Sequence, residues 1–177
     1  LEVENPPLAP NDPSFKELHA AGRIPVLDDD GYRICESNAI MIYLCSKTKN
    51  DLYPEEAKAR GLVNQFLFWD VAHWIPAYQP IQFERLVKGM LGLGETDEAV
   101  VEAALQRFAR EAAYLEGALA GKSWLVGDGA TLADFAAGAG LTHAAAMGLP
   151  LEDFPNIRAW NDRVQVLEGF KKTEVKM

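Results

Sequence analysis

The chain has 177 residues, of which 49% are hydrophobic, and it carries a formal net charge of −9 at pH 7. This size allows one large domain or two small ones with a substantial apolar core. The acidic balance, without a run of basic residues, makes nucleic acid and anionic membrane poor partners, and no apolar run is long enough to span a membrane. Cys35 and Cys45 match neither a redox pair nor a metal-binding knuckle, and they favour a reducing compartment.

Residues 1–47 predict a small domain of mixed helices and strands. Residues 1–3 fit the end of a strand. Asp12 can cap a short helix that has Pro13 at its first position and Gly22 just past its end. The sequence therefore predicts a short helix between these start and stop signals.

Two short strands are expected next, at residues 26–27 and 32–34. The Asp29-Asp30-Gly31 segment between them is a hairpin turn signal. Apolar residues then repeat at helical spacing and predict a helix over about residues 37–46.

The Ile24-Pro25 pair is the most informative feature of the chain. Proline cannot donate to a sheet ladder, so inside a β-like run it fits an edge or a bend, sometimes through a cis peptide bond. The backbone of Ile24 is then open to pair with an extended peptide, as another strand would. Glu36 and Ser37 open the following helix, whose free N–H groups favour an anion. Together these features predict a dock for a small acidic peptide, although an edge-strand proline and a serine cap would each explain one of them.

A polar segment over residues 48–55, which contains Pro54, predicts a linker. From residue 56 onward no stretch is a convincing strand. Apolar residues from Val101 to Leu119 recur in steps of three and four, which is the seam of an amphipathic helix. An all-helical second part is therefore expected over residues 56–177.

A long helix is expected upstream of this seam, over about residues 56–90. Pro76 and Pro80 must kink or break it, because proline lacks the N–H that an internal helix position donates. Gly92 and Gly94 then separate this helix from the next one.

Thr131 and Asp134 have the spacing of a capping box, in which each side chain accepts a hydrogen bond from the other residue's backbone N–H. We interpret the pair as structural, with no catalytic part. It opens a helix rich in Ala and Gly over residues 135–147, and Pro155 begins a further helix.

Three stretches of the chain resemble the cytosolic glutathione transferase family, of the bacterial or theta- and phi-like type. They are residues 22–27 with 36–44, residues 124–128 with 131–135, and residues 154–160. The resemblance implies an α+β fold. A thioredoxin-like N-terminal domain that binds glutathione is expected over residues 1–47, and an all-α C-terminal domain that shapes the second-substrate pocket over residues 56–177.

The resemblance also implies the glutathione-binding residues. Pro25 matches the family's cis proline, and the backbone of Ile24 would pair with the cysteinyl part of glutathione. Ser37 would bind the γ-glutamyl carboxylate, and Glu36 the ammonium group. Arg23 lies where it could hold the glycyl carboxylate through two hydrogen bonds.

The catalytic residue is not implied in the same way. The family's thiol-activating Ser, Tyr or Cys follows the first strand of the domain, whereas residues 1–3 match the second strand. A strand-helix unit of roughly 30 residues is therefore expected to be absent ahead of Leu1. The catalytic residue is left unknown.

Asp70, His73 and Trp74 are candidates for the second-substrate pocket or the dimer interface, because the family's corresponding helix lines both. Asp70 and His73 share a helix face at this spacing, and Asp70 is equally well interpreted as a solvated or intrahelical charge. Four aromatic residues of this helix could line an apolar pocket, although such residues more often form core. They are Trp69, Trp74, Tyr78 and Phe83.

The function that the resemblance implies is attack of the glutathione thiolate on a hydrophobic electrophile, as in detoxification. A free thiol has a pKa of about 8.5, so such an enzyme must favour the thiolate. The protein is expected to be a cytoplasmic homodimer with glutathione as co-substrate and no metal. Two alternatives stay open: a non-catalytic protein-interaction module of this fold, and a glutathione-dependent thiol-disulfide reductase or dehalogenase.

Overall fold

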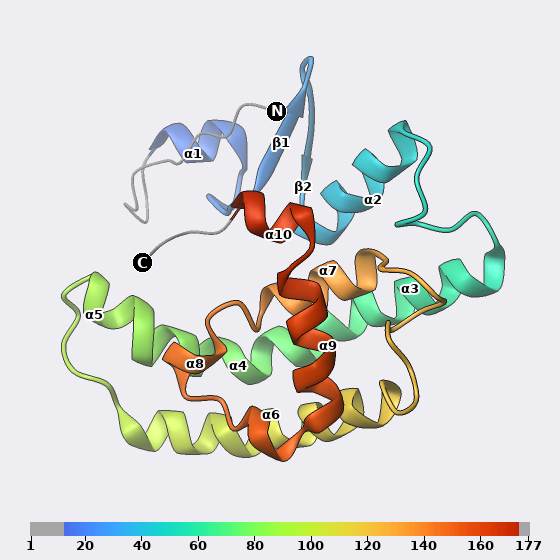
Figure 1. The fold of residues 1–177 in the computed structure, drawn as a ribbon. Coiled ribbons are helices and arrows are strands. Elements are labelled where there is room, and N and C mark those ends of the chain that lie inside the picture. The colour runs from blue at the N-terminus through green and yellow to red at the C-terminus, as the bar shows by residue number, and fades with distance from the viewer. Residues whose placement is uncertain (1–12, 174–177) are drawn as a thin grey trace. The chain divides into compact units, whose positions relative to one another are not determined.

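The computed structural model describes residues 13–173 and divides into two compact units between Lys49 and Asn50 (Figure 1). The strand end expected at residues 1–3 and the cap expected at Asp12 lie outside the described residues. None of the helices in the described part of the chain is long and apolar enough to cross a membrane.

The first unit is built around a β-hairpin. Its described elements are α1 (Pro13–Leu18), β1 (Val26–Asp29), β2 (Tyr32–Cys35) and α2 (Ser37–Lys47). The strands are antiparallel and pair in register from Val26↔Cys35 to Asp29↔Tyr32. Asp30 and Gly31 form the turn with φ of 53° and 87°, the left-handed conformations that a two-residue turn of this kind requires. The predicted hairpin and the helix after it are confirmed.

Polar contacts hold this unit together, because none of its described side chains is fully buried. Arg33 of β2 donates from Nε to Asp28 at 2.8 Å and from Nη1 to the Glu17 carbonyl at 3.2 Å, which ties the hairpin to α1. On the other side, Asp29 accepts hydrogen bonds from two residues of α2.

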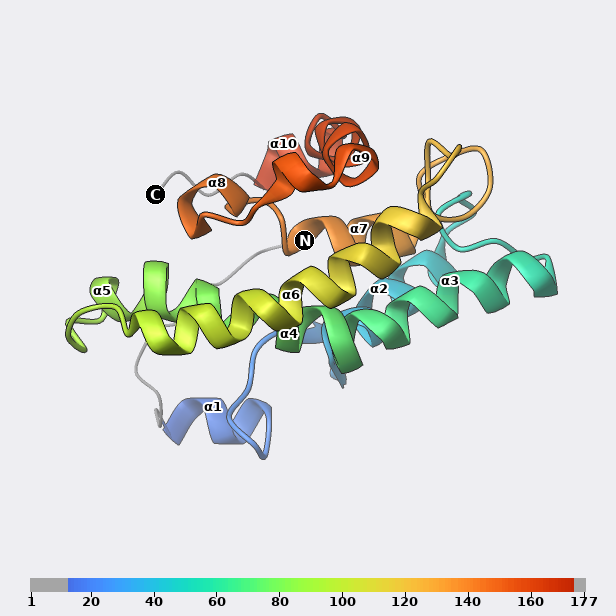
Figure 2. The same ribbon diagram turned by 90° about the horizontal axis from the view of Figure 1, so that it is seen from below.

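All regular elements among the described residues of the second unit are helical. Its α-helices are α3 (Ala57–Trp69), α4 (Ile75–Gln82), α5 (Lys88–Met90), α6 (Glu98–Ala118), α7 (Leu132–Ala139), α8 (Ala144–Met147), α9 (Pro155–Gln165) and α10 (Glu168–Thr173). Two π turns, η1 (Asp70–Trp74) and η2 (Phe83–Val87), and a short 3₁₀ turn, η3 (Leu151–Asp153), complete it. Figure 2 shows α6 lying alongside the rod formed by α3 and α4.

The long helix is not broken at its prolines, which corrects part of the expectation. It stays helical through residues 57–90 by widening into a π turn before Pro76 and another after Pro80. In the first, the Ile75 N–H donates to the Asp70 carbonyl five residues back instead of four. The inserted residue lets the helix pass a position that has no N–H to donate.

The core of the second unit lies between this rod, α6, α7 and α9. The predicted seam of α6 is confirmed, with Leu105 half-buried and the other seam residues buried. The three largest completely buried side chains come from three different elements: Trp74 from η1, Phe108 from α6 and Trp160 from α9. The unit therefore has a continuous apolar interior, in contrast to the described part of the first unit.

Asp134 is the polar centre of this core. The capping box at the start of α7 is present, and the fully buried carboxylate accepts from the Thr131 N–H at 2.8 Å and the Thr131 hydroxyl at 3.0 Å. Its other oxygen accepts from the Leu125 N–H at 2.9 Å and from Trp160 Nε1 at 2.8 Å. One carboxylate thus joins a loop, α7 and α9.

Glu116 performs a similar task at the start of α9. Its carboxylate accepts from the Asn156 N–H at 3.0 Å, from Asn156 Nδ2 at 2.7 Å and from the Ile157 N–H at 2.9 Å. The first N–H groups of a helix have no acceptor within the helix, and a negative charge suits this end of the helix dipole. Glu116 therefore fastens α9 to α6.

We expect Glu116→Ala to lower the free energy of unfolding of the second unit by about 2 kcal/mol, because hydrogen bonds to a charged group are lost. Urea unfolding followed by tryptophan fluorescence measures this, since all tryptophans of the chain lie after residue 50. Glu102→Ala, at an exposed position of the same helix, is the matched control and should stay within about 0.5 kcal/mol of the wild type. Equal losses in the two variants would contradict the anchoring role.

Candidate functional site

The hairpin register brings two sequence-distant segments together. Val26 pairs with Cys35 at the end of the ladder, so Pro25, which precedes Val26, and Glu36, which follows Cys35, emerge at the same end. Paired residues in an antiparallel ladder have Cα atoms about 4.5–5.5 Å apart. The open end of the hairpin, opposite the Asp30-Gly31 turn, therefore gathers the residues that the sequence singled out.

The Ile24-Pro25 peptide bond is cis, as expected. The Ile24 side chain is 64% exposed, and its backbone has no hydrogen-bond partner among residues 13–173. Its N–H and C=O groups are thus available to pair with an extended ligand, as strand edges are.

Glu36 rather than Ser37 is the N-cap of α2, and it caps through its backbone alone. The Ile40 N–H donates to the Glu36 carbonyl at 2.9 Å, and no side chain caps the helix. The alternative interpretation of Ser37 as a capping serine is therefore wrong. Both side chains are exposed and have no partner within the described part of the chain.

Glu36 also has an unusual backbone conformation, with φ of 67° and ψ of 115°. A non-glycine residue rarely adopts positive φ, and such strained residues cluster at functional sites. The strained residue lies at the point where the chain turns from β2 into α2, beside the cis bond.

Arg23 lies two residues before Pro25 and extends the same end of the hairpin. Its N–H is 3.5 Å from Nδ1 of His19, which also accepts from the Ala21 N–H at 3.1 Å. His19 therefore organises the loop after α1, as a structural residue. The Arg23 guanidinium makes no ion pair with a described residue, so it is open to an anionic group.

Asp70, His73 and Trp74 lie in the second unit, in η1, and do not form one surface. Asp70 is 2% exposed and Trp74 is completely buried, whereas His73 is exposed. The indole of Trp74 donates to the Ala137 carbonyl at 3.0 Å. Trp74 is therefore core and cannot line a pocket or a dimer interface, and Asp70 is not a solvated charge. Asp70 and His73 do not share a face, because the π turn between them changes the helical register.

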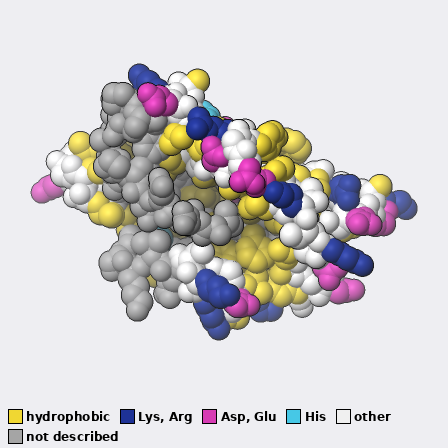
Figure 3. Space-filling model, turned by 90° about the horizontal axis from the view of Figure 1, so that it is seen from above, with side chains coloured by type: hydrophobic (Ala, Val, Ile, Leu, Met, Phe, Trp, Pro, Cys, Tyr) yellow, Lys and Arg dark blue, Asp and Glu magenta, His cyan; other side chains and the backbone are white. Residues whose placement is uncertain are grey.

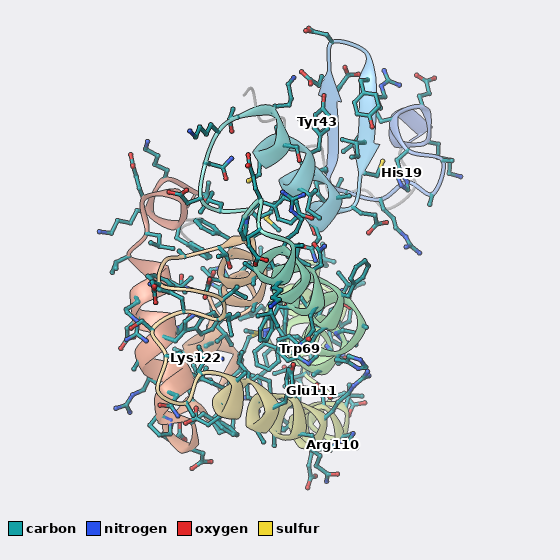
Figure 4. The ribbon with its side chains drawn as sticks, turned by 90° about the vertical axis from the view of Figure 1, so that its right-hand side faces the viewer. His19, Tyr43, Trp69, Arg110, Glu111 and Lys122 are labelled. Carbon is teal, nitrogen blue, oxygen red and sulfur yellow. The ribbon has the colours of Figure 1, made fainter. Side chains whose placement is uncertain are left out.

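The other aromatic candidates of this helix also belong to the core, except Phe83, which is exposed. Trp69 is buried and points to α6, where its Nε1 donates to Glu111 at 3.0 Å (Figure 4). Burial and the charge of Asp70 raise the pKa of Tyr78 far above its ordinary value, so this phenol stays protonated. The alternative of an apolar pocket made by these rings is wrong.

A polar cluster on the hairpin was missed by sequence reasoning. The Asp29 carboxylate accepts from the Tyr43 hydroxyl at 2.5 Å and from Lys47, both on α2. Hydrogen bonds from Lys47 and Tyr43 hold the pKa of Asp29 below its ordinary value, and Asp29 raises the pKa of Lys47. The four-residue spacing of Tyr43 and Lys47 on one helix face was the available signal.

Cys35 and Cys45 are both half-buried in the first unit and form no disulfide with each other. Burial raises the pKa of Cys45, which disfavours its reactive thiolate form. On the described surface seen in Figure 3, acidic and basic side chains alternate with apolar areas, and no large area has one sign of charge.

Comparison with known proteins gives consistent matches. Residues 1–46 match the family described as "Glutathione S-transferase, N-terminal domain", and residues 62–168 match "Glutathione S-transferase, C-terminal domain". The chain is 34% identical over 169 residues to glutathione S-transferase 3 of Zea mays, which covers 91% of this chain and 74% of that protein. It is 29% identical over 168 residues to glutathione S-transferase theta-2 of Homo sapiens, covering 88% of this chain and 65% of the relative.

Solved structures give the same result. A glutathione S-transferase from Rhodospirillum rubrum F11 superposes with a TM-score of 0.83 at 26% identity, over 94% of this chain and 78% of that one. The chain thus has the fold of these proteins and spans about two thirds to three quarters of the length of the relatives named above.

Proposed function

The chain belongs to the glutathione S-transferase family, and from that premise we propose that it binds glutathione at the open end of its hairpin and conjugates the thiolate to a hydrophobic electrophile. One observation carries the proposal. The strand register brings the cis Ile24-Pro25 bond and the strained Glu36 at the start of α2 to the same place.

The backbone of Ile24 binds the cysteinyl part of glutathione as a further strand would. This role of Ile24 is supported because its backbone has no hydrogen-bond partner among the described residues. Ser37 holds the γ-glutamyl carboxylate with its hydroxyl and with its N–H, which lies in the first turn of α2 and points out of the helix. Pro25 sets the bend of the chain between Ile24 and β1 through its cis peptide bond.

The charges of the proposed site complement those of glutathione, which has two carboxylates and one ammonium group. Glu36 binds the ammonium, and Arg23 binds the glycyl carboxylate. Both side chains are exposed and make no ion pair with a described residue, so neither must give up a partner when the ligand arrives. An Arg can hold a carboxylate through two parallel hydrogen bonds.

In the proposed transferase step, the glutathione thiolate attacks the hydrophobic electrophile, because the thiolate is the nucleophilic form of the sulfur. Relatives matched by this chain are named glutathione S-transferases, which supports conjugation as the reaction. We propose a cytoplasmic location for the protein, which the absence of a disulfide between its two cysteines supports.

We further propose a homodimer that uses exposed apolar side chains of α3 and η1, with Phe68 as the main contact. Phe68 is 73% exposed, and Leu62 and Val71 are also exposed on this segment. A large aromatic side chain as exposed as Phe68 suits a protein interface, and most soluble oligomers are homo-oligomers with closed symmetry, two-fold dimers above all. Analytical ultracentrifugation of the wild type and of Phe68→Asp tests this. A monomeric wild type would contradict it.

Replacing Ser37 by Ala is expected to weaken glutathione binding about tenfold, because a carboxylate loses a hydrogen-bond donor. Isothermal titration calorimetry with reduced glutathione measures the affinity. Ser46→Ala is the matched control on the same helix, since the Ser46 hydroxyl only donates to the Ile42 carbonyl at 2.8 Å. Unchanged affinity in Ser37→Ala would refute the assignment of Ser37. A wild type that binds no glutathione would refute the proposed function and favour the non-catalytic interaction module.

A further inference from the structure

Asp29 connects the hairpin to α2 at a distance from the proposed glutathione site. It is the last residue of β1 before the turn, and its Oδ2 accepts from the Tyr43 hydroxyl at 2.5 Å and from Lys47 Nζ. The Lys47 ammonium also lies over the Tyr43 ring, 5.5 Å from its centroid. The Tyr43 ring in turn packs 5.2 Å from the ring of Tyr32 on β2. We name Asp29, Tyr43 and Lys47 the α2 clamp.

The α2 clamp and the proposed site lie at opposite ends of the same two elements. Asp29 is four residues from Pro25 along the strand, which is about 13 Å at the rise of an extended chain. Tyr43 is six residues from Ser37, about 9 Å along the helix. At the site end, α2 is joined to the hairpin through Glu36. At the other end, the clamp joins them through the hydrogen bonds that Asp29 accepts from Tyr43 and Lys47.

The first unit depends on this contact because α2 has no fully buried residue. An exposed ion pair normally contributes little. The Asp29 side chain, however, is only 26% exposed, and it also receives a charge-assisted hydrogen bond from a phenol, a class of bond that is short and strong. The pKa of Asp29 is lower in the folded chain than in the unfolded chain. The contact therefore stabilises the fold fully above the unfolded-state pKa, and this stabilisation is lost as the pH falls through the folded-state pKa. At neutral pH the clamp is complete.

We propose that Asp29 is a positioning residue for glutathione. By fixing the second half of α2 against the hairpin, it holds Ser37 at the separation from Ile24 that the ligand must span. This inference rests on the proposed function and adds a residue to it that contacts no part of the ligand.

The neighbouring carboxylate provides a matched control. Asp28 accepts from Arg33 Nε at 2.8 Å and from the Gly31 N–H at 2.8 Å, both within the hairpin. It makes no hydrogen bond or ion pair with α2 among the described residues, so its loss alters the hairpin turn without releasing the helix.

The test compares calorimetric affinity for reduced glutathione in the wild type, Asp29→Asn, Asp28→Asn and Asp29→Glu. Asp29→Asn should bind roughly tenfold more weakly, since small displacements of binding groups by remote changes cost this much or more. Asp28→Asn should stay within about twofold, and Asp29→Glu should recover part of the loss because it restores the carboxylate. Amide hydrogen exchange of the unliganded variants should show faster exchange in α2 of Asp29→Asn, with the β1–β2 ladder unchanged.

Tyr43→Phe is a second test of the clamp, for the case that Asp29→Asn does not fold. It removes only the hydroxyl that donates to Asp29 and keeps the ring packed on Tyr32. It should show the same faster exchange in α2 and a weaker affinity. If the wild type binds glutathione and both Asp29→Asn and Tyr43→Phe bind equally well, the positioning role is overturned and the proposed function stands. If the wild type does not bind glutathione, the positioning role and the proposed function are both refuted. Equal losses in Asp28→Asn and Asp29→Asn would also overturn the positioning role, since they would reflect the hairpin alone.

Discussion

The Asp134→Ala variant is expected to lose about 3–5 kcal/mol of unfolding free energy in the second unit. The carboxylate is completely buried, and its removal leaves four donors without an acceptor in the core: the N–H and hydroxyl of Thr131, the Leu125 N–H and Trp160 Nε1. Each buried donor left unsatisfied costs about 1–3 kcal/mol, although such losses are not additive.

Asp134→Asn separates the charge from the shape. The amide keeps one oxygen for Leu125 and Trp160 but turns an NH₂ group toward the two Thr131 donors, so an intermediate loss is expected. Asp128→Ala, at an exposed position in the preceding loop, is the control and should be nearly neutral. Urea midpoints from tryptophan fluorescence and circular dichroism give the free energies. A loss below about 1 kcal/mol in Asp134→Ala would contradict the central role of this carboxylate.

Trp74→Ala is expected to cost a similar 3–5 kcal/mol, the usual range for removing a buried tryptophan or phenylalanine. The Trp74 ring lies 5.4 Å from Trp69, 5.1 Å from Phe108 and 5.9 Å from Tyr78, measured between ring centroids. Its removal opens a cavity in the middle of the aromatic core and leaves the Ala137 carbonyl without its donor.

Trp74→Phe keeps a ring at this position and loses the indole N–H, so a loss of about 1–2 kcal/mol is expected. The same urea experiment, followed by circular dichroism because a fluorophore is removed, gives both values. If Trp74→Ala were as stable as the wild type but changed the affinity for an electrophile, Trp74 would be a pocket residue after all and the description of this core would be wrong.

The hairpin and the helical seam were predictable because local chemistry determines them. Asp30-Gly31 supplies the two left-handed residues that a tight turn needs, and the steps of three and four along α6 specify one buried face. The same periodicity failed at Asp70 and His73. It assumes 3.6 residues per turn, whereas η1 is a π turn, so one side chain is buried and the other exposed.

The contacts that fasten one element to another were not predictable. Glu116 binds the start of α9 forty residues away, and Asp29 binds α2 across the hairpin turn. No local pattern distinguishes such carboxylates from solvated ones. The strained conformation of Glu36 was also hidden, because positive φ is expected for Gly or Asn rather than Glu. Ser37 consequently looked like a cap, a role that the structure gives to the Glu36 backbone.

Titration of the ¹⁵N-labelled chain with reduced glutathione, followed by amide chemical shifts, tests the central claim most directly. Binding where the open end of the hairpin meets α2 should shift the amides of residues 23–24, 26–27 and 35–39 first and most strongly. Shifts confined to residues after 50, or no shifts at millimolar glutathione, would contradict it.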